Sequence, residues 1–189
     1  MDRSVDFAVL QDLHLWGADT LKHFQNRLGE AKTSELILDK LVKVVDGNTF
    51  KYVSLGPRGR KQLGLRPHHT TEAATAARHI MRRDARAQLE QLGMTFVGAE
   101  DRALRRFRDA EGKTYFLATS LSAKTAGYTA RAVRRLLSKY RPLLLETKGI
   151  LIIATPQPGR LSRTLTNHED YVKTLQIDAS ICKVGSLYK

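Results

Sequence analysis

Several things are scarce in this 189-residue sequence, and each shortage excludes a class of protein. There is a single cysteine, Cys182, so neither an intramolecular disulfide framework nor a two-cysteine zinc knuckle can form. No apolar run approaches the roughly 20 residues that a membrane-spanning helix needs. The N-terminal stretch carries acids where a secretory signal peptide has a basic flank and an apolar core. We therefore predict a cytoplasmic protein that does not contact a membrane.

Sequence patterns of catalysis are missing as well. There is no Walker-type phosphate loop and no Gly-x-Ser-x-Gly nucleophile elbow. Adjacent histidines at 68 and 69 have no cysteine near them and make a poor metal site. We predict no catalytic residue, no metal site and no cofactor.

Acidic residues are also in short supply relative to basic ones. Lysine and arginine number 32 against 19 aspartates and glutamates, which gives a net charge of +13. A surplus of +9 lies in residues 94–189 alone. Such an excess favours a polyanionic partner, because each phosphate contact releases condensed counterions. We predict double-stranded DNA as that partner.

Residues 1–66 have the pattern of three helices followed by a hairpin. Apolar residues recur at helical spacing from Phe7 to Trp16, and a second short helix begins after Asp19, which can cap it. The third helix is predicted over residues 32–45, capped by Thr33 or Ser34.

A turn follows at residues 46–48, and a strand at residues 50–55. The stretch "GPRGRKQLGL" then begins a turn and a short helix, with Pro57 suited to its first turn. This order of elements is that of a winged helix-turn-helix domain.

The winged-helix interpretation assigns DNA contacts to two segments. The third helix would read bases or touch adjacent phosphates, and "GPRGRK" would be the basic end of the wing. Two acids on that helix are unfavourable near phosphates, and the alternative is a small helical domain that binds protein. The predicted DNA-binding residues of this part are Lys32, Thr33, Ser34, Lys40, Lys51, Arg58, Arg60 and Lys61.

The middle of the chain, residues 67–93, is predicted to be a connecting helix that starts at Thr70 and ends at Gly93. A stripe of small and apolar residues follows three- and four-residue spacing. It either packs onto the rest of the chain or forms the seam of a homodimer, and packing is the simpler interpretation. The stripe consists of Ala74, Ala77, Met81, Ala85, Leu89 and Leu92.

Residues 94–189 have the pattern of an α/β domain. We predict a strand over 94–98, a hairpin that turns at 110–113, a helix over 125–146 and a buried strand over 149–156. A further helix over 158–176 and a last strand over 178–188 complete it. Four cations on the helix over 125–146 are predicted to raise DNA affinity through charge alone: Arg131, Arg134, Arg135 and Lys139.

In their order, these pieces resemble the replication-relaxation family of plasmid and mobile-element proteins. "YVSLGPRGRKQLGL" is similar to the family's winged-helix end, and "RPHHTTEAATAARHIMR" to its His-led helix, with His69 at the His position. "KTYFLATSLSAKTAGYTARAVRRLLSKYRPLL" is similar to the strand-then-helix unit that ends near a Lys and a Tyr, here Lys139 and Tyr140. "GILIIATPQPGRL" matches the next strand. The resemblance implies an α+β chain whose C-terminal domain has a restriction-endonuclease-like fold.

One departure from the family bears on catalysis. The family's strand usually carries a Glu-x-Asp pair, whereas Ala118 and Ser120 stand at those positions here. A divalent metal needs oxygen ligands, usually from more than one carboxylate. We therefore predict a catalytically inactive domain in a DNA-binding protein that acts in transcription regulation or replication of a mobile element. The alternatives are a metal-dependent nuclease or strand-transfer enzyme, and a basic module that binds protein or RNA.

Overall fold

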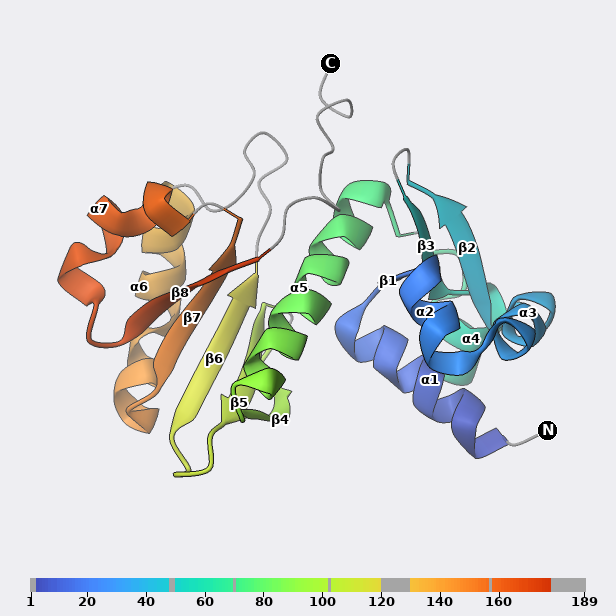
Figure 1. The fold of residues 1–189 in the computed structure, drawn as a ribbon, viewed down its shortest axis with the longest axis horizontal. Helices are drawn as coiled ribbons and strands as arrows, with labels where there is room; N and C mark the ends of the chain where they lie inside the picture. The colour runs from blue at the N-terminus through green and yellow to red at the C-terminus, as the bar shows by residue number, and fades with distance from the viewer. Residues whose placement is uncertain are drawn as a thin grey trace, which may run out of the picture. The chain divides into compact units, whose positions relative to one another are not determined.

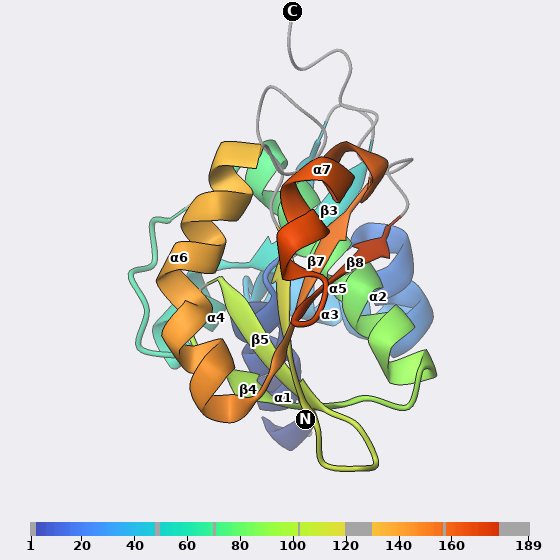
Figure 2. The same ribbon diagram turned by 90° about the vertical axis from the view of Figure 1, so that its left-hand side faces the viewer.

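A computed structural model describes residues 3–47, 50–69, 71–101, 103–119, 130–156 and 158–177 (Figures 1 and 2). The protein is of the α+β class, and its contacts divide it into two compact units. Their boundary falls between Arg83 and Asp84, inside helix α5 (Ala73–Gln91), not at the expected limits of a connector over 67–93. We call the described residues before the boundary unit 1 and those after it unit 2. Among the described residues, no helix combines the length and the apolar character needed to span a membrane.

Unit 1 consists of helices, one hairpin and a two-residue strand. The strand β1 pairs antiparallel with β3, which also pairs antiparallel with β2, so the sheet order is β1-β3-β2. The core gathers apolar side chains from α1, α2, α3 and the sheet. The elements are α1 (Arg3–Trp16), β1 (Asp19–Thr20), α2 (Leu21–Leu28), α3 (Glu30–Leu38), β2 (Val42–Asp46), β3 (Lys51–Leu55) and α4 (Pro57–Gln62).

The first half of α5 is bound into unit 1 by two polar side chains. Arg83, which is 8% exposed, donates from Nη1 to Asp12 Oδ2 at 2.9 Å and from Nε to the Ala18 carbonyl at 3.0 Å. His79 Nδ1 accepts from the Ala18 amide at 3.1 Å. Gly17 has φ of 81°, and a Cβ there would lie 2.1 Å from His79 Nδ1, so only glycine fits. These contacts make the helix part of the unit's fold.

The third helix is present, but its predicted bounds of 32–45 are wrong, because α3 begins at Glu30 and ends at Leu38. Lys40 has a left-handed φ of 57°, its amide bonds Ile37 O at 2.9 Å, and the Leu41 amide bonds Leu36 O at 3.0 Å. These two bonds form a Schellman ending, a role in which glycine is usual and lysine gives no sequence signal. The β-branched residues that follow then pair with β3 as strand β2.

The predicted helix caps also differ from the observed ones. Thr20, not Asp19, caps α2, and its Oγ1 accepts from the His23 amide at 3.1 Å. Asp19 instead lies buried in β1. Gly29 occupies the N-cap of α3, so Thr33 and Ser34 lie within that helix.

Unit 2 is built on a mixed five-stranded sheet in the order β4-β5-β6-β7-β8. Strands β4, β5 and β6 are antiparallel neighbours, whereas β7 runs parallel to both β6 and β8. Figure 1 shows α6 on one face of this sheet and the second half of α5 on the other. The bounds are β4 (Thr95–Ala99), β5 (Leu104–Arg108), β6 (Thr114–Thr119), α6 (Ala130–Thr147), β7 (Ile150–Thr155) and β8 (Val172–Gln176).

Most elements of unit 2 were predicted from the sequence, with one correction. The strand at β4, the β5–β6 hairpin and the fully buried β7 are confirmed. The helix predicted over 158–176 is wrong, because short helical turns at η1 (Pro158–Leu161), α7 (Ser162–Leu165) and η2 (Thr166–His168) lead into β8. Val172 pairs with Leu151 in register, so β7 supplies the hydrogen bonds that make this segment a strand. The last predicted strand, 178–188, lies outside the described residues.

The α5 stripe is largely buried, as expected if it packs onto the rest of the chain. Ala77, Met81, Ala85 and Leu89 are each at most 1% exposed, whereas Ala74 is half-buried and Leu92 is 67% exposed. Leu92 follows the last residue of the helix, and Gly93 has φ of 81°, as predicted for a helix-ending glycine.

Candidate nucleic-acid interface

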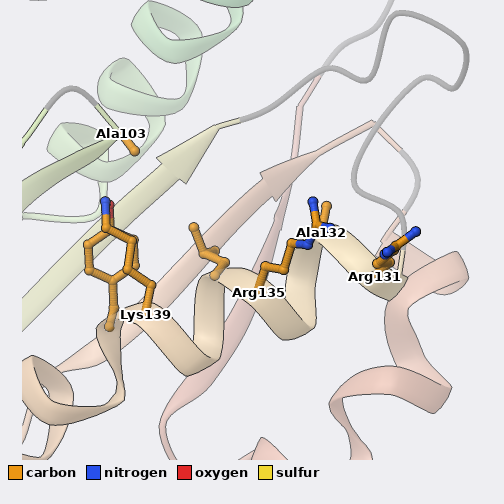
Figure 3. Close-up of a pocket in the computed structure, with 7 residues that line it drawn as sticks. Ala103, Arg131, Ala132, Arg135 and Lys139 are labelled. Atoms are coloured by element: carbon orange, nitrogen blue, oxygen red, sulfur yellow. The ribbon is translucent and has the colours of Figure 1, made fainter.

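A surface hollow of about 360 Å³ lies along helix α6 and carries a row of cations (Figure 3). Arg131, Arg135 and Lys139 line it at four-residue spacing, which places them on one side of the helix. In the figure Arg131 and Arg135 lie on successive turns, with Lys139 further along and Ala103 across from the helix. The remaining lining residues are Ala132, Leu136 and Tyr140.

The sequence of α6 explains why these cations face outward. Val133, Leu137, Tyr140 and Leu144 follow a spacing of three and four, and all are buried in the core of unit 2. Arginines at other positions of the same helix are therefore left on the surface, and Arg131, Arg134 and Arg135 are all exposed. The apolar stripe fixes the orientation of the helix and so fixes the cationic face.

Lys139 is held at one end of the hollow by a carboxylate. Its Nζ donates to Asp101 Oδ2 at 2.8 Å and to the Tyr140 hydroxyl at 2.7 Å. That hydroxyl also donates to Asp101 Oδ2, at 2.5 Å. The other carboxylate oxygen, Oδ1, accepts from the amides of Ala103 at 2.6 Å and Leu104 at 3.0 Å. This cluster ties the segment before β5 to α6.

The pKa values of the cluster follow from these contacts. Burial opposes ionisation of Asp101, but hydrogen bonds from Lys139, Tyr140 and two amides outweigh it and hold the carboxyl pKa well below its usual range. The hydrogen bond to Asp101, and then the one to Tyr140, raise the pKa of Lys139. Burial and the Asp101 hydrogen bond raise the pKa of the Tyr140 hydroxyl. At neutral pH the cluster is thus a charged pair with a neutral phenol.

The four cations of α6 that were predicted to bind DNA therefore fall into two groups. Lys139 is neutralised by Asp101, so the prediction that all four act through charge alone does not hold for this residue. Arg131, Arg134 and Arg135 have no ion pair with any carboxylate in the part of the chain that the structure describes. These three unpaired guanidinium groups can bind phosphate or another anion.

The predicted contacts on the third helix need correction. Lys32 Nζ lies 2.6 Å from Asp6 Oδ1 and 3.2 Å from Glu35 Oε1, so its charge is already neutralised. Thr33 is 1% exposed, and its hydroxyl donates to the Gly29 carbonyl at 2.8 Å. A buried side chain with a satisfied hydroxyl cannot reach DNA. Ser34 is exposed on α3.

Lys40 is exposed in the turn that follows α3. Lys51 is also exposed, and its Nζ lies 3.8 Å from Asp46 Oδ1. Arg58, Arg60 and Lys61 are not at the tip of the hairpin, because they belong to α4 after β3. The expected short helix with Pro57 in its first turn is confirmed. The assignment of this basic run to the end of the wing is wrong, because the run forms helix α4, in which the Arg60 amide donates to the Gly56 carbonyl at 2.9 Å.

Sequence analysis did not single out Asp101. An aspartate that accepts amide hydrogen bonds from residues two and three positions later is a common turn device. That local signal predicts a turn, but its partners Lys139 and Tyr140 are 38 and 39 positions away. Only folding brings these side chains together.

The described carboxylates do not suggest a metal centre. Across the described ranges, no group of three or more histidine, cysteine, aspartate or glutamate side chains could hold a metal ion. Ala118 is buried in β6, and Ser120 lies outside the described residues.

No protein-family model and no curated protein matches the chain. A solved structure described as EndoMS in apo form is similar to it, with a TM-score of 0.37 and 16% sequence identity. The similarity covers 71% of this chain and 64% of that chain. This chain therefore spans less than two thirds of the length of the solved chain.

Proposed function

We propose that the chain is a DNA-binding protein that contacts the phosphate backbone of duplex DNA through helix α6. The observation that carries this proposal is the row of exposed arginines, Arg131, Arg134 and Arg135, without a carboxylate partner among the described residues. Exposed cations that a fold leaves unpaired keep their full charge for an external polyanion, and the net charge of +13 adds long-range attraction.

The topology of each unit supports the finer assignment of its fold. Unit 1 has the order helix, strand, helix, helix, strand, strand, with sheet order β1-β3-β2, and we propose that it is a winged helix-turn-helix domain. In unit 2, a helix precedes three antiparallel strands, and α6 then leads to a parallel strand. We propose that this is a restriction-endonuclease-like domain that binds DNA without cutting it.

The process in which the protein acts is part of the same proposal. The resemblance to the replication-relaxation family implies transcription regulation or replication of a plasmid or other mobile element. Footprinting on the DNA upstream of its own coding sequence tests this, and a protected site there is the expected result.

The DNA-binding proposal is tested by replacing these three arginines in the full chain. The variant Arg131→Gln/Arg134→Gln/Arg135→Gln should bind every duplex more weakly than the unaltered protein. The slope of log affinity against log salt should fall by up to about 3, roughly one for each phosphate that the protein no longer neutralises. Fluorescence anisotropy with a labelled duplex over a series of salt concentrations measures both quantities.

A variant with the same decrease in charge provides the control. Arg108→Gln/Arg163→Gln/Lys173→Gln removes three exposed cations from other elements of unit 2. We expect its salt slope to stay close to that of the unaltered protein. If the slope fell equally in both variants, binding would depend on net charge and not on α6. If the unaltered protein did not bind duplex DNA, the proposed function would be wrong.

The absence of DNA cleavage is proposed separately. Asp101 is engaged by Lys139, Tyr140 and two amides, which leaves its oxygens poorly placed to hold a magnesium ion. Supercoiled plasmid should therefore stay intact with magnesium or manganese under conditions in which the protein binds it. Nicking that disappeared in an Asp101→Asn variant would contradict this proposal.

A further inference from the structure

Charge is unevenly divided along unit 1. Residues 1–39 contain four cations and seven acids, whereas residues 40–66 contain seven cations and a single acid, Asp46. Asp46 lies 3.8 Å from Lys51 and so does not neutralise the others. The segment that comprises the turn after α3, the hairpin and α4 is thus strongly cationic, whereas residues 1–39 before it are acidic overall.

Two of these cations, Lys43 of β2 and Arg60 of α4, are half-buried, and the helix that carries Arg60 packs against the strand that carries Lys43. Burial, and after it the positive charge of Arg60, lower the pKa of Lys43. Within the described ranges, neither side chain forms an ion pair with a carboxylate. Two partly desolvated like charges without a counter-ion are unfavourable, and an anion bound beside them would offset that cost.

The fold holds the two cations in place. The Gly56 amide bonds the Leu41 carbonyl at 2.9 Å, so the start of α4 is fixed to the turn that leads into β2. A Cβ on Gly59 would lie 2.1 Å from the Leu41 carbonyl oxygen, which shows how closely the helix approaches that turn.

Arg60 keeps most of its hydrogen-bonding capacity. Its Nε donates to the Arg66 carbonyl at 2.5 Å, and this bond restrains the guanidinium group. The group has five N–H donors, and the other four make no hydrogen bond to any residue that the structure describes. They can donate to the oxygens of a tetrahedral anion.

Helix α3, whose residues are all described, carries no cation that is free of a carboxylate partner. Its exposed positions include Glu30, Ser34 and Leu38, and its cation Lys32 is paired with Asp6 and Glu35. An anionic DNA backbone is therefore attracted to the β2–α4 side of the unit and not to the body of α3.

We infer that Lys43 and Arg60 form a binding site for a backbone phosphate of duplex DNA. This inference rests on the proposed function, and it adds Lys43 as the partner of Arg60, which was already among the predicted DNA-binding residues. Ammonium and guanidinium groups donate charge-assisted hydrogen bonds to phosphate oxygens, and such contacts carry no base information. The site positions the duplex on unit 1 without selecting its sequence.

The test uses single substitutions in the full chain. Lys43→Gln and Arg60→Gln should each lower affinity for a short labelled duplex about fivefold to tenfold at about 0.1 M salt, and reduce the salt slope by about 1. The decrease should be the same for two duplexes of unrelated sequence. The control Lys22→Gln removes an exposed lysine from α2 and should change affinity less than about twofold.

Stability in the absence of DNA provides a second measurement. Because Lys43 lies near a like charge, Lys43→Gln should be at least as stable to urea as the unaltered protein. A loss of stability in that variant would show a structural role and overturn the inference.

The outcomes separate the inference from the proposed function. If the unaltered chain bound duplex DNA and both variants bound as tightly as Lys22→Gln, the phosphate site would be overturned while the proposed function stood. If the unaltered chain bound no duplex at all, the proposed function would fail first.

Discussion

Helices α5 and α6 are the two longest in the protein, and both are rich in arginine, yet they use it differently. On α5, Arg83 is buried and bonds Asp12 and the Gly17 and Ala18 carbonyls, and Arg86 bonds Glu90 at 2.7 Å. On α6, the exposed arginines have no such partner among the described residues. The same residue type stabilises a fold in one helix and forms a surface for a partner in the other.

The difference follows from what surrounds each guanidinium group. Arg83 is 8% exposed beside a carboxylate and backbone carbonyls, so its charge and hydrogen bonds are satisfied within the chain. Burial raises the pKa of Asp12, whereas the positive charges of Arg83 and Arg27 lower it. The effect of the two arginines is larger, so the pKa lies below its usual value. An arginine-rich helix is therefore evidence for nucleic-acid binding only when its arginines are unpaired.

The largest effect is expected at Arg83. Arg83→Met should destabilise unit 1 by about 3 kcal/mol, because it removes the ion pair between Arg83 and the partly buried Asp12 and leaves several backbone carbonyls without their donor. Urea unfolding followed by the fluorescence of buried Trp16, the single tryptophan, measures this. Arg78→Met is the control, since Arg78 bonds Thr75 Oγ1 at 2.8 Å and no carboxylate in the described chain. Equal destabilisation of both variants would show that Arg83 has no special role.

A smaller effect is expected at Asp101, where α6 does use a cation for structure. Asp101→Asn should destabilise unit 2 by about 1–2 kcal/mol at pH 7, because the carboxylate that accepts from Lys139 and Tyr140 is one-third exposed. Circular dichroism during urea unfolding measures the difference.

The difference in stability between the unaltered protein and Asp101→Asn should depend on pH. The folded-state pKa of Asp101 lies below its unfolded value, so the stability it contributes is present above about pH 4 and is lost as pH falls toward the folded pKa. The difference in the free energy of unfolding between the two proteins should therefore decrease below about pH 4. A gap that stayed constant from neutral to acidic pH would contradict the assigned hydrogen bonds.

The smallest effect on stability is expected at the exposed arginines of α6. Arg131→Gln and Arg135→Gln should each change the free energy of unfolding by less than about 0.5 kcal/mol, because neither side chain is buried or paired in the described structure. Urea unfolding checks this beside the DNA-binding measurements. A large destabilisation would place these arginines with Arg83, as parts of the fold.

Local pattern was enough to predict many of the elements. The helical spacing of α1, the apolar run of β7 and the turn of the β5–β6 hairpin were all evident from the sequence. The errors arose where a distant segment decides the local structure. The valines of β2 become a strand because β3 pairs with them, and Val172 begins β8 because β7 lies alongside.

The candidate site was likewise predicted from the sequence only in part. The four cations of α6 that were predicted to bind DNA were found from the sequence, and their exposure follows from the apolar stripe on the same helix. The sequence did not predict that Lys139 and Lys32 are neutralised, because their partners Asp101 and Asp6 are 38 and 26 positions away in the chain. Lys43 and Arg60 likewise come together only through the packing of α4 on the turn before β2.

By itself, the sequence determined the net positive charge, its concentration in residues 94–189 and the amphipathic pattern that orients α6. These are properties of composition and of neighbours three or four residues apart, which a chain carries before it folds. Only the tertiary structure decided which cations keep their charge for a partner. Arg83 meets Asp12 across 71 positions, whereas the arginines of α6 meet no described carboxylate. Whether a charge is paired depends on which side chains folding brings within hydrogen-bond distance, and local sequence does not contain that information.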